Sequence, residues 1–340
     1  MKLILILILI IINIFISTLF IACNNSNSSN NNYGAYSGPA SCVNNKSLTL
    51  DETIVGGNQV TNNNTTLTGN NTVAIILNNQ NNTKTIECTG TIVASNLILT
   101  AGHCFDEVGS SNTSPGWVIF ADTYDSFNIN NSASISCWQR PGGYIPCSVS
   151  DTYNCILNDI TWVKINGNIS RFNNYVTTSI LANPQTISAR ESKWMLGFGK
   201  LSDNPPSRNS NKYMVQSSSS NTYPDTLPSG AARAFDSYTF SNAYENYLTV
   251  IGPNTTPPKG TCEGDSGGPV YVLRNGNYVL AALTQGSNSL LTPKPTNTSP
   301  TYTFDYTKYA SCDDGYGVYT TVGNYISWIQ SSSGVTLSTY

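Results

Sequence analysis

Charged residues are scarce in this chain of 340 residues. Asp, Glu, Lys and Arg together make up only 10% of it, and the formal net charge is -3. Proteins that bind nucleic acid need clustered Lys and Arg to displace the counterions of the phosphates, so this composition argues against a nucleic-acid partner. Hydrophobic residues still make up 39% of the chain and aromatic residues 10%. That is enough apolar surface for a packed core, which excludes a wholly disordered chain.

Histidine is scarcer still, because His103 is the only one in the chain. A metal site built from several histidines is therefore impossible, and any histidine-dependent catalysis has to use this residue. The nine cysteines contain no C-x-x-C pair, which is the spacing of many zinc sites and thioredoxin-like redox sites. The sequence therefore predicts neither a metal site nor a cofactor.

The longest apolar run lies at the N-terminus. Residues 3–21 follow a Met-Lys start and are almost wholly apolar, as in a secretory signal peptide; the run is also long enough for an uncleaved membrane anchor. The sequence Phe-Ile-Ala-Cys at 20–23 resembles the lipobox of bacterial lipoproteins, although Leu is usual where Phe20 stands. We therefore expect residues 1–22 to be a signal peptide. The exported chain is expected to be a lipoprotein anchored to a membrane through Cys23, in the periplasm or at the cell surface, or else to be secreted.

A change in composition marks the start of the globular region. Residues 23–53 are rich in Asn and Ser, and the polar stretch 24–32 cannot bury apolar surface, so this segment is predicted to be a lipid-tethered propeptide. From Ile54 onward, short β-rich runs alternate with Asn, Gly, Ser and Pro. The runs are Thr72–Leu77, Thr89–Thr100, Trp117–Phe120, Asp159–Ile165 and Val270–Leu273.

One pair of turn residues and one C-terminal stretch complete the secondary-structure prediction. Asn275-Gly276 lies between two apolar runs and favours a hairpin, since both residues accept a positive φ. Only the segment near Tyr325–Gln330 has a helical pattern. Many short strands without alternating helices are typical of an all-β barrel or sandwich.

Four segments contain the residue types of nucleophilic catalysis. They are Thr-Ala-Gly-His-Cys at 100–104, Asn-Asp-Ile at 158–160, Cys-Glu-Gly-Asp-Ser-Gly-Gly-Pro at 262–269 and Ile-Val-Gly-Gly at 54–57. A hydroxyl becomes a nucleophile when a neighbouring imidazole takes its proton and a buried carboxylate orients that imidazole. The segments supply one histidine, one aspartate and one serine for these roles.

The order of these residues along the chain separates three mechanisms. Gly-Asp-Ser-Gly-Gly at 264–268 also fits the nucleophile elbow of α/β-hydrolases, but there the histidine follows the serine, and here His103 precedes it. The subtilisin order requires an aspartate before the histidine, and only Asp51, in the expected propeptide, qualifies. The order His, Asp, Ser remains.

Together these motifs resemble the trypsin/chymotrypsin family of serine proteases over about residues 54–331, with weaker matches at 196–199 and 317–320. The resemblance implies an all-β fold of two packed antiparallel β-barrels with a C-terminal α-helix. It places the protease domain at 54–333, with the first barrel at about 54–185 and the second at about 186–333. The implied activity is that of a serine endopeptidase acting on proteins or peptides.

The resemblance also assigns catalytic roles. His103 is the general base and then the general acid, Asp159 holds its tautomer, and Ser266 attacks the scissile carbonyl. The backbone N–H groups of Gly264 and Ser266 form the oxyanion hole, where glycine lets the chain bend sharply. Asp159 is favoured over three other aspartates because Asn-Asp-Ile-Thr runs into an apolar strand, as in the family. The rivals are Asp122, Asp125 and Asp151.

The family's substrate-pocket positions map to Gly260, Thr261, Thr284, Gly286 and Gly317. Gly260 at the pocket base carries no carboxylate, and glycines at the wall leave the pocket open, which favours a bulky apolar P1 residue. Thr284 stands where the family usually has Ser. Lys259 lies next to the pocket base, so recognition of an acidic P1 residue is the alternative.

By the same resemblance, cleavage before Ile54 would free an α-amino group that pairs with Asp265 and shapes the oxyanion hole. Thr53 precedes the scissile bond, so an activator that requires Arg or Lys would not cut there. Another protease, or the enzyme itself, would have to cleave Thr53-Ile54.

Eight cysteines remain besides Cys23, an even number that suggests up to four disulfides in an exported chain. The resemblance pairs Cys88 with Cys104 and Cys262 with Cys312. Three pairings are open for the remaining four, with Cys137–Cys147 and Cys42–Cys155 favoured.

Two functions from other classes stay open. One is a catalytically idle, surface-displayed binding module that keeps the protease fold, favoured by the altered pocket strand and the non-basic Thr53. The other is a structural adhesin whose Asn- and Thr-rich loops bind partners.

Overall fold

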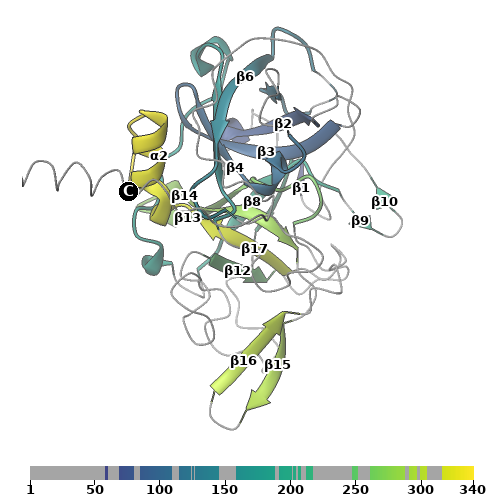
Figure 1. Ribbon diagram of the computed structural model, residues 1–340, viewed down its shortest axis with the longest axis vertical. Helices are drawn as coiled ribbons and strands as arrows, with labels where there is room; N and C mark the ends of the chain where they lie inside the picture. The colour runs from purple at the N-terminus through teal and green to yellow at the C-terminus, as the bar shows by residue number, and fades with distance from the viewer. Residues whose placement is uncertain are drawn as a thin grey trace, which may run out of the picture. The chain divides into compact units, whose positions relative to one another are not determined.

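Strands make up most of the regular structure in the computed structural model of this chain (Figure 1). The structure describes residues 58–59, 69–79, 85–108, 115–123, 125, 127–144, 158–187, 191–200, 202–203, 206–207, 212–216, 247–251, 261–287, 291–296, 299–304 and 316–340. They all belong to one unit, Ala35–Tyr340. The expected signal peptide, Cys23, the propeptide and Ile54 lie outside the described residues. In the part of the chain that the structure describes, no helix has the length and apolar character needed to cross a membrane.

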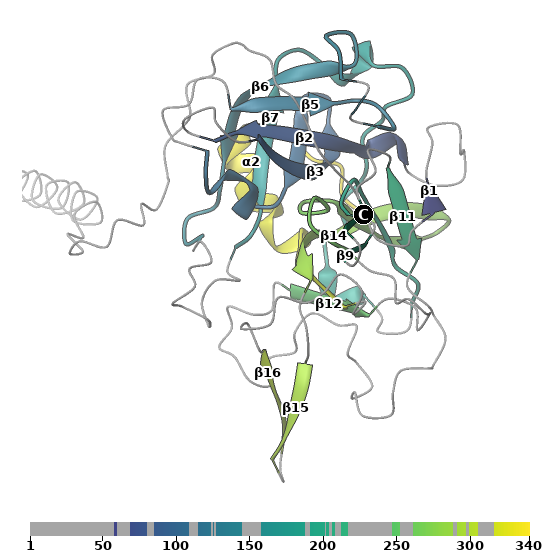
Figure 2. The same cartoon turned by 90° about the vertical axis from the view of Figure 1, so that its right-hand side faces the viewer.

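Six strands of the first half of the chain close into an antiparallel barrel. In barrel order they are β2 (Thr72–Asn78), β3 (Thr85–Ala94), β4 (Leu97–Thr100), β7 (Thr161–Ile165), β6 (Ser132–Gln139) and β5 (Gly116–Ile119). Figure 2 shows β2, β5, β6 and β7 stacked one above another. Strand β2 is buried along its whole length: Val73, Ile75 and Leu77 face one core cluster, and Ala74 and Ile76 face another. A strand covered on both faces explains a continuous apolar run rather than an alternating one.

The β-rich run Thr89–Thr100 is a hairpin rather than one strand. Strand β3 ends at Ala94 and β4 begins at Leu97, and these two residues pair across the turn. Ser95-Asn96 forms the turn, and both are residue types that favour turns. Apolar residues on both sides of such a short polar turn conceal it in the sequence.

A seven-stranded antiparallel sheet forms the second half of the fold. In spatial order its strands are β1 (Asn58–Gln59), β11 (Tyr213–Gln216), β8 (Trp194–Gly197), β13 (Pro269–Arg274), β14 (Asn277–Ser287), β17 (Tyr316–Thr321) and β12 (Tyr247–Ile251). Two further pairs are β9 (Ser202–Asp203) with β10 (Pro206–Ser207), and β15 (Leu291–Thr296) with β16 (Ser299–Phe304). The predicted turn between β13 and β14 is present, with φ of 49° at Asn275 and 81° at Gly276.

Short helices connect these strands. The 3-10 helices among the described residues are η1 (Gly69–Asn71), η2 (His103–Phe105), η4 (Ile169–Arg171), η5 (Pro184–Thr186) and η8 (Gly323–Tyr325). The α-helix α2 (Ile326–Ser333) lies where the C-terminal helix was predicted and ends at Gly334, which adopts a left-handed conformation with φ of 68°. The predicted all-β fold is confirmed. It consists of a closed barrel, a second antiparallel sheet and a C-terminal helix.

The helix and the tail after it hold the two halves of the fold together. The indole N–H of Trp162, in β7, donates to Ser332 Oγ at 2.8 Å. After the helix, Ser338 accepts a backbone hydrogen bond from Ile180, in the segment between the two halves. Ile180 also bridges to Leu280 in β14.

Candidate active site

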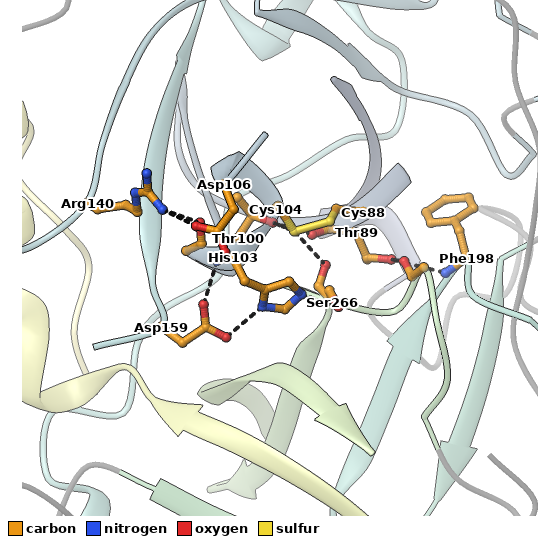
Figure 3. Close-up of a disulfide and its surroundings, with 12 residues drawn as sticks. Cys88, Thr89, Thr100, His103, Cys104, Asp106, Arg140, Asp159, Phe198 and Ser266 are labelled. Atoms are coloured by element: carbon orange, nitrogen blue, oxygen red, sulfur yellow. Dashed lines mark hydrogen bonds and ion pairs between the residues drawn. A yellow bond between two sulfur atoms is a disulfide. The ribbon is translucent and has the colours of Figure 1, made fainter. Parts of the chain in front are cut away.

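His103 lies on a 3-10 turn that follows a barrel strand. Strand β4 ends at Thr100, and η2 begins at His103 after two small residues. The predicted disulfide between Cys88 in β3 and Cys104 is present and ties this turn to the barrel wall (Figure 3). The hydroxyl of Thr100 donates to a carbonyl of β3 at 2.8 Å. The histidine is therefore held on a braced turn rather than on a free loop.

Asp159 stands immediately before β7 and is buried. The preceding Asn158 has φ of 59°, a left-handed conformation that Asn tolerates. Its amide group donates to Gly143 O at 3.0 Å, and its Oδ1 accepts from the Tyr325 hydroxyl at 2.9 Å. This turn directs the carboxylate to His103, whose backbone N–H donates to Oδ1 at 2.7 Å and whose Nδ1 lies 2.8 Å from Oδ2.

The imidazole lies between this carboxylate and a serine hydroxyl. Because a carboxylate only accepts hydrogen bonds, Nδ1 must carry a proton, which leaves Nε2 of the neutral ring as an acceptor. Nε2 lies 2.8 Å from Ser266 Oγ, and Figure 3 shows the three side chains in line. Burial lowers the pKa of His103, but the charge and hydrogen bond of Asp159 raise it, and the net result is a pKa above the ordinary 6.5.

The loop that carries Ser266 bends through positive φ angles. Gly264 has φ of 95° and Gly267 has φ of 83°. The N–H of Asp265, between them, donates to Cys262 O at 3.1 Å. The N–H groups of Gly264 and Ser266 make no hydrogen bond within the described part of the chain. Two backbone donors beside a serine hydroxyl that contacts an imidazole are arranged as an oxyanion hole would require.

Thr89 of β3 joins this loop to the barrel. Its backbone N–H donates to Ser266 O at 2.8 Å, and its hydroxyl donates to Gly264 O at 2.9 Å. The same hydroxyl accepts from the Phe198 N–H at 3.1 Å. The serine of the second sheet is thus positioned against the barrel that holds the other two residues.

Asp265 is fully buried, and its carboxylate accepts hydrogen bonds from the N–H groups of Gly199 and Cys262, both at 2.8 Å. A Cβ at Gly197 or Gly199 would lie 2.2 or 2.6 Å from this carboxyl group, so these glycines make room for it. The described residues provide no cation for Asp265, and burial raises its pKa to about 8 despite the two hydrogen bonds. Ile54, the expected partner, lies outside the described residues.

Thr261 leads into a small buried polar group. Its hydroxyl lies 3.2 Å from the Tyr319 hydroxyl, which also donates to Met195 Sδ at 3.1 Å. Tyr319 is buried, and burial raises its pKa, so the phenol stays neutral. Gly260, the expected pocket base, lies outside the described residues.

The other expected pocket residues lie on neighbouring strands. Thr284 and Gly286 are in β14, where Gly286 pairs with Val318 and Ser287 pairs with Gly317 of β17. Within the part of the chain that the structure describes, a Cβ at Gly286 would meet nothing within 4 Å. Thr284 is fully buried, and among the described residues its hydroxyl has no hydrogen-bond partner. The structure thus brings Thr284, Gly286 and Gly317 to one pair of strands.

Two more of the cysteines, Cys262 and Cys137, lie among the described residues. Cys262 is disulfide-bonded, and its expected partner Cys312 lies outside the described residues. Cys137 is buried in β6. Cys42, Cys147 and Cys155 are outside the described residues, so the pairing of these four stays a prediction.

Two groups of residues near the site were not predicted from the sequence. One is the pair Tyr319 and Met195, and the other is the cluster of Asp106, Arg140 and Tyr144 beside His103. The cluster joins residues 34 and 38 positions apart, and no local spacing marks such contacts. Within the described residues, no group of three or more His, Cys, Asp or Glu side chains is arranged to hold a metal ion.

The chain is similar in sequence to trypsins. The family model described as Trypsin matches residues 54–329. Trypsin I-P38 of Gallus gallus is 27% identical over 255 residues, which cover 72% of this chain and 79% of the relative. Trypsin-1 of Astacus astacus is 24% identical over 72% of this chain and 87% of its own length. Among solved structures, a scabies mite inactivated protease paralogue has a TM-score of 0.55 at 14% identity, covering 84% of this chain and 100% of that chain.

Proposed function

The chain belongs to the trypsin family of serine peptidases, and from that premise we propose that it is an endopeptidase using His103, Asp159 and Ser266. The observation that carries the proposal is the continuous set of contacts from Asp159 through the imidazole to the serine hydroxyl, with both side-chain distances at 2.8 Å. The sole histidine of the chain stands in the middle of this set.

The proposed reaction proceeds through an acyl-enzyme. Ser266 Oγ attacks the substrate carbonyl carbon while His103 Nε2 takes the hydroxyl proton, and the carbonyl electron pair moves onto oxygen. The N–H groups of Gly264 and Ser266 would receive that oxyanion. The imidazolium then gives its proton to the leaving amine as the C–N bond breaks. Water then attacks the acyl-enzyme carbonyl while His103 takes a proton from the water. His103 gives this proton to Ser266 Oγ as the ester C–O bond breaks.

For specificity we propose a bulky apolar P1 residue. The buried Thr261–Tyr319–Met195 group supports this preference because it contains no ionised side chain. Among the described residues a Cβ at Gly286 would meet nothing within 4 Å, which supports an open pocket wall. Cleavage of a peptide library chiefly after Phe, Tyr, Leu or Met would agree with this proposal. Cleavage chiefly after Arg or Lys, or after Asp or Glu, would contradict it.

For activation we propose that the chain is made as a zymogen and cleaved at Thr53-Ile54, by an activating protease or by the enzyme itself. The buried carboxyl of Asp265 supports this step, since a charged carboxylate without a cation is costly in the protein interior. The new α-amino group of Ile54 would supply that cation.

For location we propose that residues 1–22 are a signal peptide, that 23–53 are the propeptide and that 54–333 are the protease domain. Lipidation of Cys23 would anchor the exported chain to a membrane. Mass spectrometry of the mature N-terminal peptide tests this assignment, with Cys23→Ser as the control. An unmodified peptide that still begins at Met1 would contradict both the cleavage and the lipid anchor.

The deciding experiment is fluorophosphonate labelling followed by intact mass measurement. Two versions of the chain are compared, one starting at Ala40 and one at Ile54, each with a Ser266→Ala control. Labelling only of the version that starts at Ile54 is expected for a zymogen. Equal labelling of both would support the peptidase activity but contradict a requirement for the ion pair between the Ile54 amine and Asp265.

The same experiment tests the alternative, a catalytically idle binding module. The scabies mite protein with a similar fold is described as an inactivated protease paralogue. The fold is therefore not by itself evidence of catalysis. Absence of labelling in both versions, in protein shown to be folded and disulfide-bonded, would favour the binding module.

A further inference from the structure

A second carboxylate, Asp106, lies directly after the turn that carries His103. Its side chain is 30% exposed, yet both oxygens have partners. Oδ1 accepts from Arg140 Nη1 at 2.5 Å, and the Tyr144 hydroxyl lies 2.8 Å from Oδ1 and 2.9 Å from Oδ2. Figure 3 shows the Arg140–Asp106 pair by the turn that carries His103. None of these three residues takes part in the proton transfers described above.

Arg140 holds the turn on both sides of the histidine. Besides pairing with Asp106, its Nη1 donates to Gly102 O at 3.3 Å. Its guanidinium also lies over two aromatic rings, 5.4 Å from the centre of Trp138 and 4.3 Å from that of Tyr144. The Arg140 side chain is only 12% exposed. Because the two rings hold the guanidinium in place, its hydrogen bonds to Gly102 and Asp106 restrain the residues before and after His103.

Tyr144 connects this cluster to the other carboxylate of the site. A Cβ at Gly102 would lie 2.8 Å from Tyr144 Cε2 and 3.0 Å from Asp159 Oδ1, so the ring edge and the Asp159 carboxylate border the same glycine. Burial, followed by the negative charges of Asp159 and Asp106, raises the pKa of Tyr144. The phenol is therefore a hydrogen-bond donor at every working pH.

We propose that Arg140, Tyr144 and Asp106 are positioning residues for His103, holding its turn and balancing the charge around its imidazole. This proposal rests on the proposed function of His103 as the base. An unrestrained Asp106 would add a second anion beside the imidazolium and favour it over the neutral ring that accepts the serine proton. Arg140 offsets that anion, and the single Tyr144 hydroxyl, close to both oxygens, holds the carboxylate in place.

The two charges act on His103 in opposite directions. Asp106 raises the pKa of His103, as Asp159 does more strongly, whereas Arg140 and burial lower it. Asp106→Asn is therefore expected to lower the pKa of His103 and Arg140→Gln to raise it, each by roughly 0.3 pH unit or more. The double variant should lie between them. If Asp106 and Arg140 had merely structural roles, the two substitutions would not shift the pKa of His103 in opposite directions.

Because His103 is the only histidine, NMR titration of 15N-histidine-labelled protein reports this one imidazole. The titration is done with Ser266→Ala in the chain that starts at Ile54, so that self-cleavage cannot interfere. Arg274→Gln is the matched control, since it breaks another partly buried pair, Arg274–Glu191, and should leave the titration unchanged. Shifts of the same sign, or no larger than this control gives, would overturn the proposal.

Activity measurements with Ser266 in place complete the test. Arg140→Lys keeps the charge but loses the planar fork, so we expect an unchanged His103 pKa and a kcat lowered roughly 3- to 10-fold with little change in KM. Tyr144→Phe is expected to lower kcat in the same way. If Arg140→Gln does not fold, the lower pKa in Asp106→Asn and the lower kcat in Arg140→Lys remain required outcomes. Absence of fluorophosphonate labelling in the parent chain would reject the proposed function and leave the NMR result to decide the charge balance.

Discussion

Two glycines with nearly the same backbone angle show why the residue after Ser266, the proposed nucleophile, has to be glycine. Gly267 has φ of 83° and Gly276 has φ of 81°. A Cβ at Gly267 would lie 2.0 Å from Thr100 Oγ1, 2.4 Å from Thr89 O and 2.6 Å from Ala101 N. At Gly276 it would meet no described residue within 4 Å. A side chain at either position would have an unfavourable backbone conformation. Only at Gly267 would it also clash with neighbouring atoms.

We therefore predict that Gly276→Ala lowers the free energy of unfolding by about 1 kcal/mol, the usual cost of placing alanine in the left-handed region. Gly267→Ala should cost at least about 3 kcal/mol, because backbone atoms of the barrel and loop must also move. It should also abolish labelling of Ser266. Urea unfolding and fluorophosphonate labelling measure the two effects, and equal stability losses would contradict the steric argument.

The pH dependence of activity is also decided at single residues. His103 must be neutral to accept the serine proton, so kcat/KM should rise with pH through its pKa. Since Asp159 raises that pKa against the effect of burial, the midpoint should lie above 6.5. Asp159→Asn should move the midpoint down and lower kcat by orders of magnitude, because the carboxylate no longer selects the tautomer. A midpoint unchanged by this substitution, measured in pH-rate profiles, would argue against the assigned role.

At the scale of elements, the C-terminal tail is a stabilising segment. Tyr340 N–H donates to Ile180 O at 2.8 Å, and Ala182 N–H donates to Tyr340 O at 3.1 Å. Leu337, within the same tail, is 6% exposed and packs with Ile329 of α2 in one core cluster. The last residues therefore fix the segment between barrel and sheet rather than hanging free.

We predict that Leu337→Ala lowers the free energy of unfolding by about 2–3 kcal/mol, as expected for removing a buried leucine side chain. Thr336→Ala, at an exposed neighbour, should change it by less than about 0.5 kcal/mol. Chemical denaturation of both variants measures the difference. Similar values for the two would mean that the tail contributes little to the fold.

Element prediction from the sequence depended on whether a local signal marked each boundary. The β13–β14 hairpin was predictable because Asn275-Gly276 is a turn signal with a specific backbone conformation. The β3–β4 hairpin was not separated, because Ser95-Asn96 is a weaker signal inside a long apolar run. The helix α2 was placed correctly from its pattern, but its last turn, up to the left-handed Gly334, was missed.

At the scale of the whole molecule, the candidate site is assembled from three distant segments. His103 and Asp159 are 56 residues apart, and Ser266 is 163 residues from His103. The order of residue types and the single histidine predicted which side chains belong together. Sequence reasoning could not predict the Thr89 contacts that align the serine loop, nor the Asp106–Arg140–Tyr144 cluster. These contacts depend on packing between elements that carry no shared sequence pattern.

Burial of Asp265 couples the proposed activation step to the stability of the entire fold. Its pKa is raised to about 8, against an ordinary value of 3.8. Between these values the folded chain keeps a proton that the unfolded chain has lost, so folding stability falls as pH rises. In the uncleaved chain this loss should run from about pH 4 to about pH 8. A free Ile54 amine would stabilise the carboxylate and remove the loss.

We therefore predict that the version starting at Ala40 is less stable at pH 8 than at pH 5, by roughly 2 kcal/mol or more. The version starting at Ile54 should lack most of this difference. His103 also titrates in this window, so Asp265→Asn in the longer version is the reference that isolates the Asp265 contribution. Lys193 and Lys212, whose pKa burial lowers to about 8, change charge mainly above the window. Equal pH dependence of the longer chain and its Asp265→Asn variant, in urea unfolding, would show that Asp265 is already neutralised before cleavage.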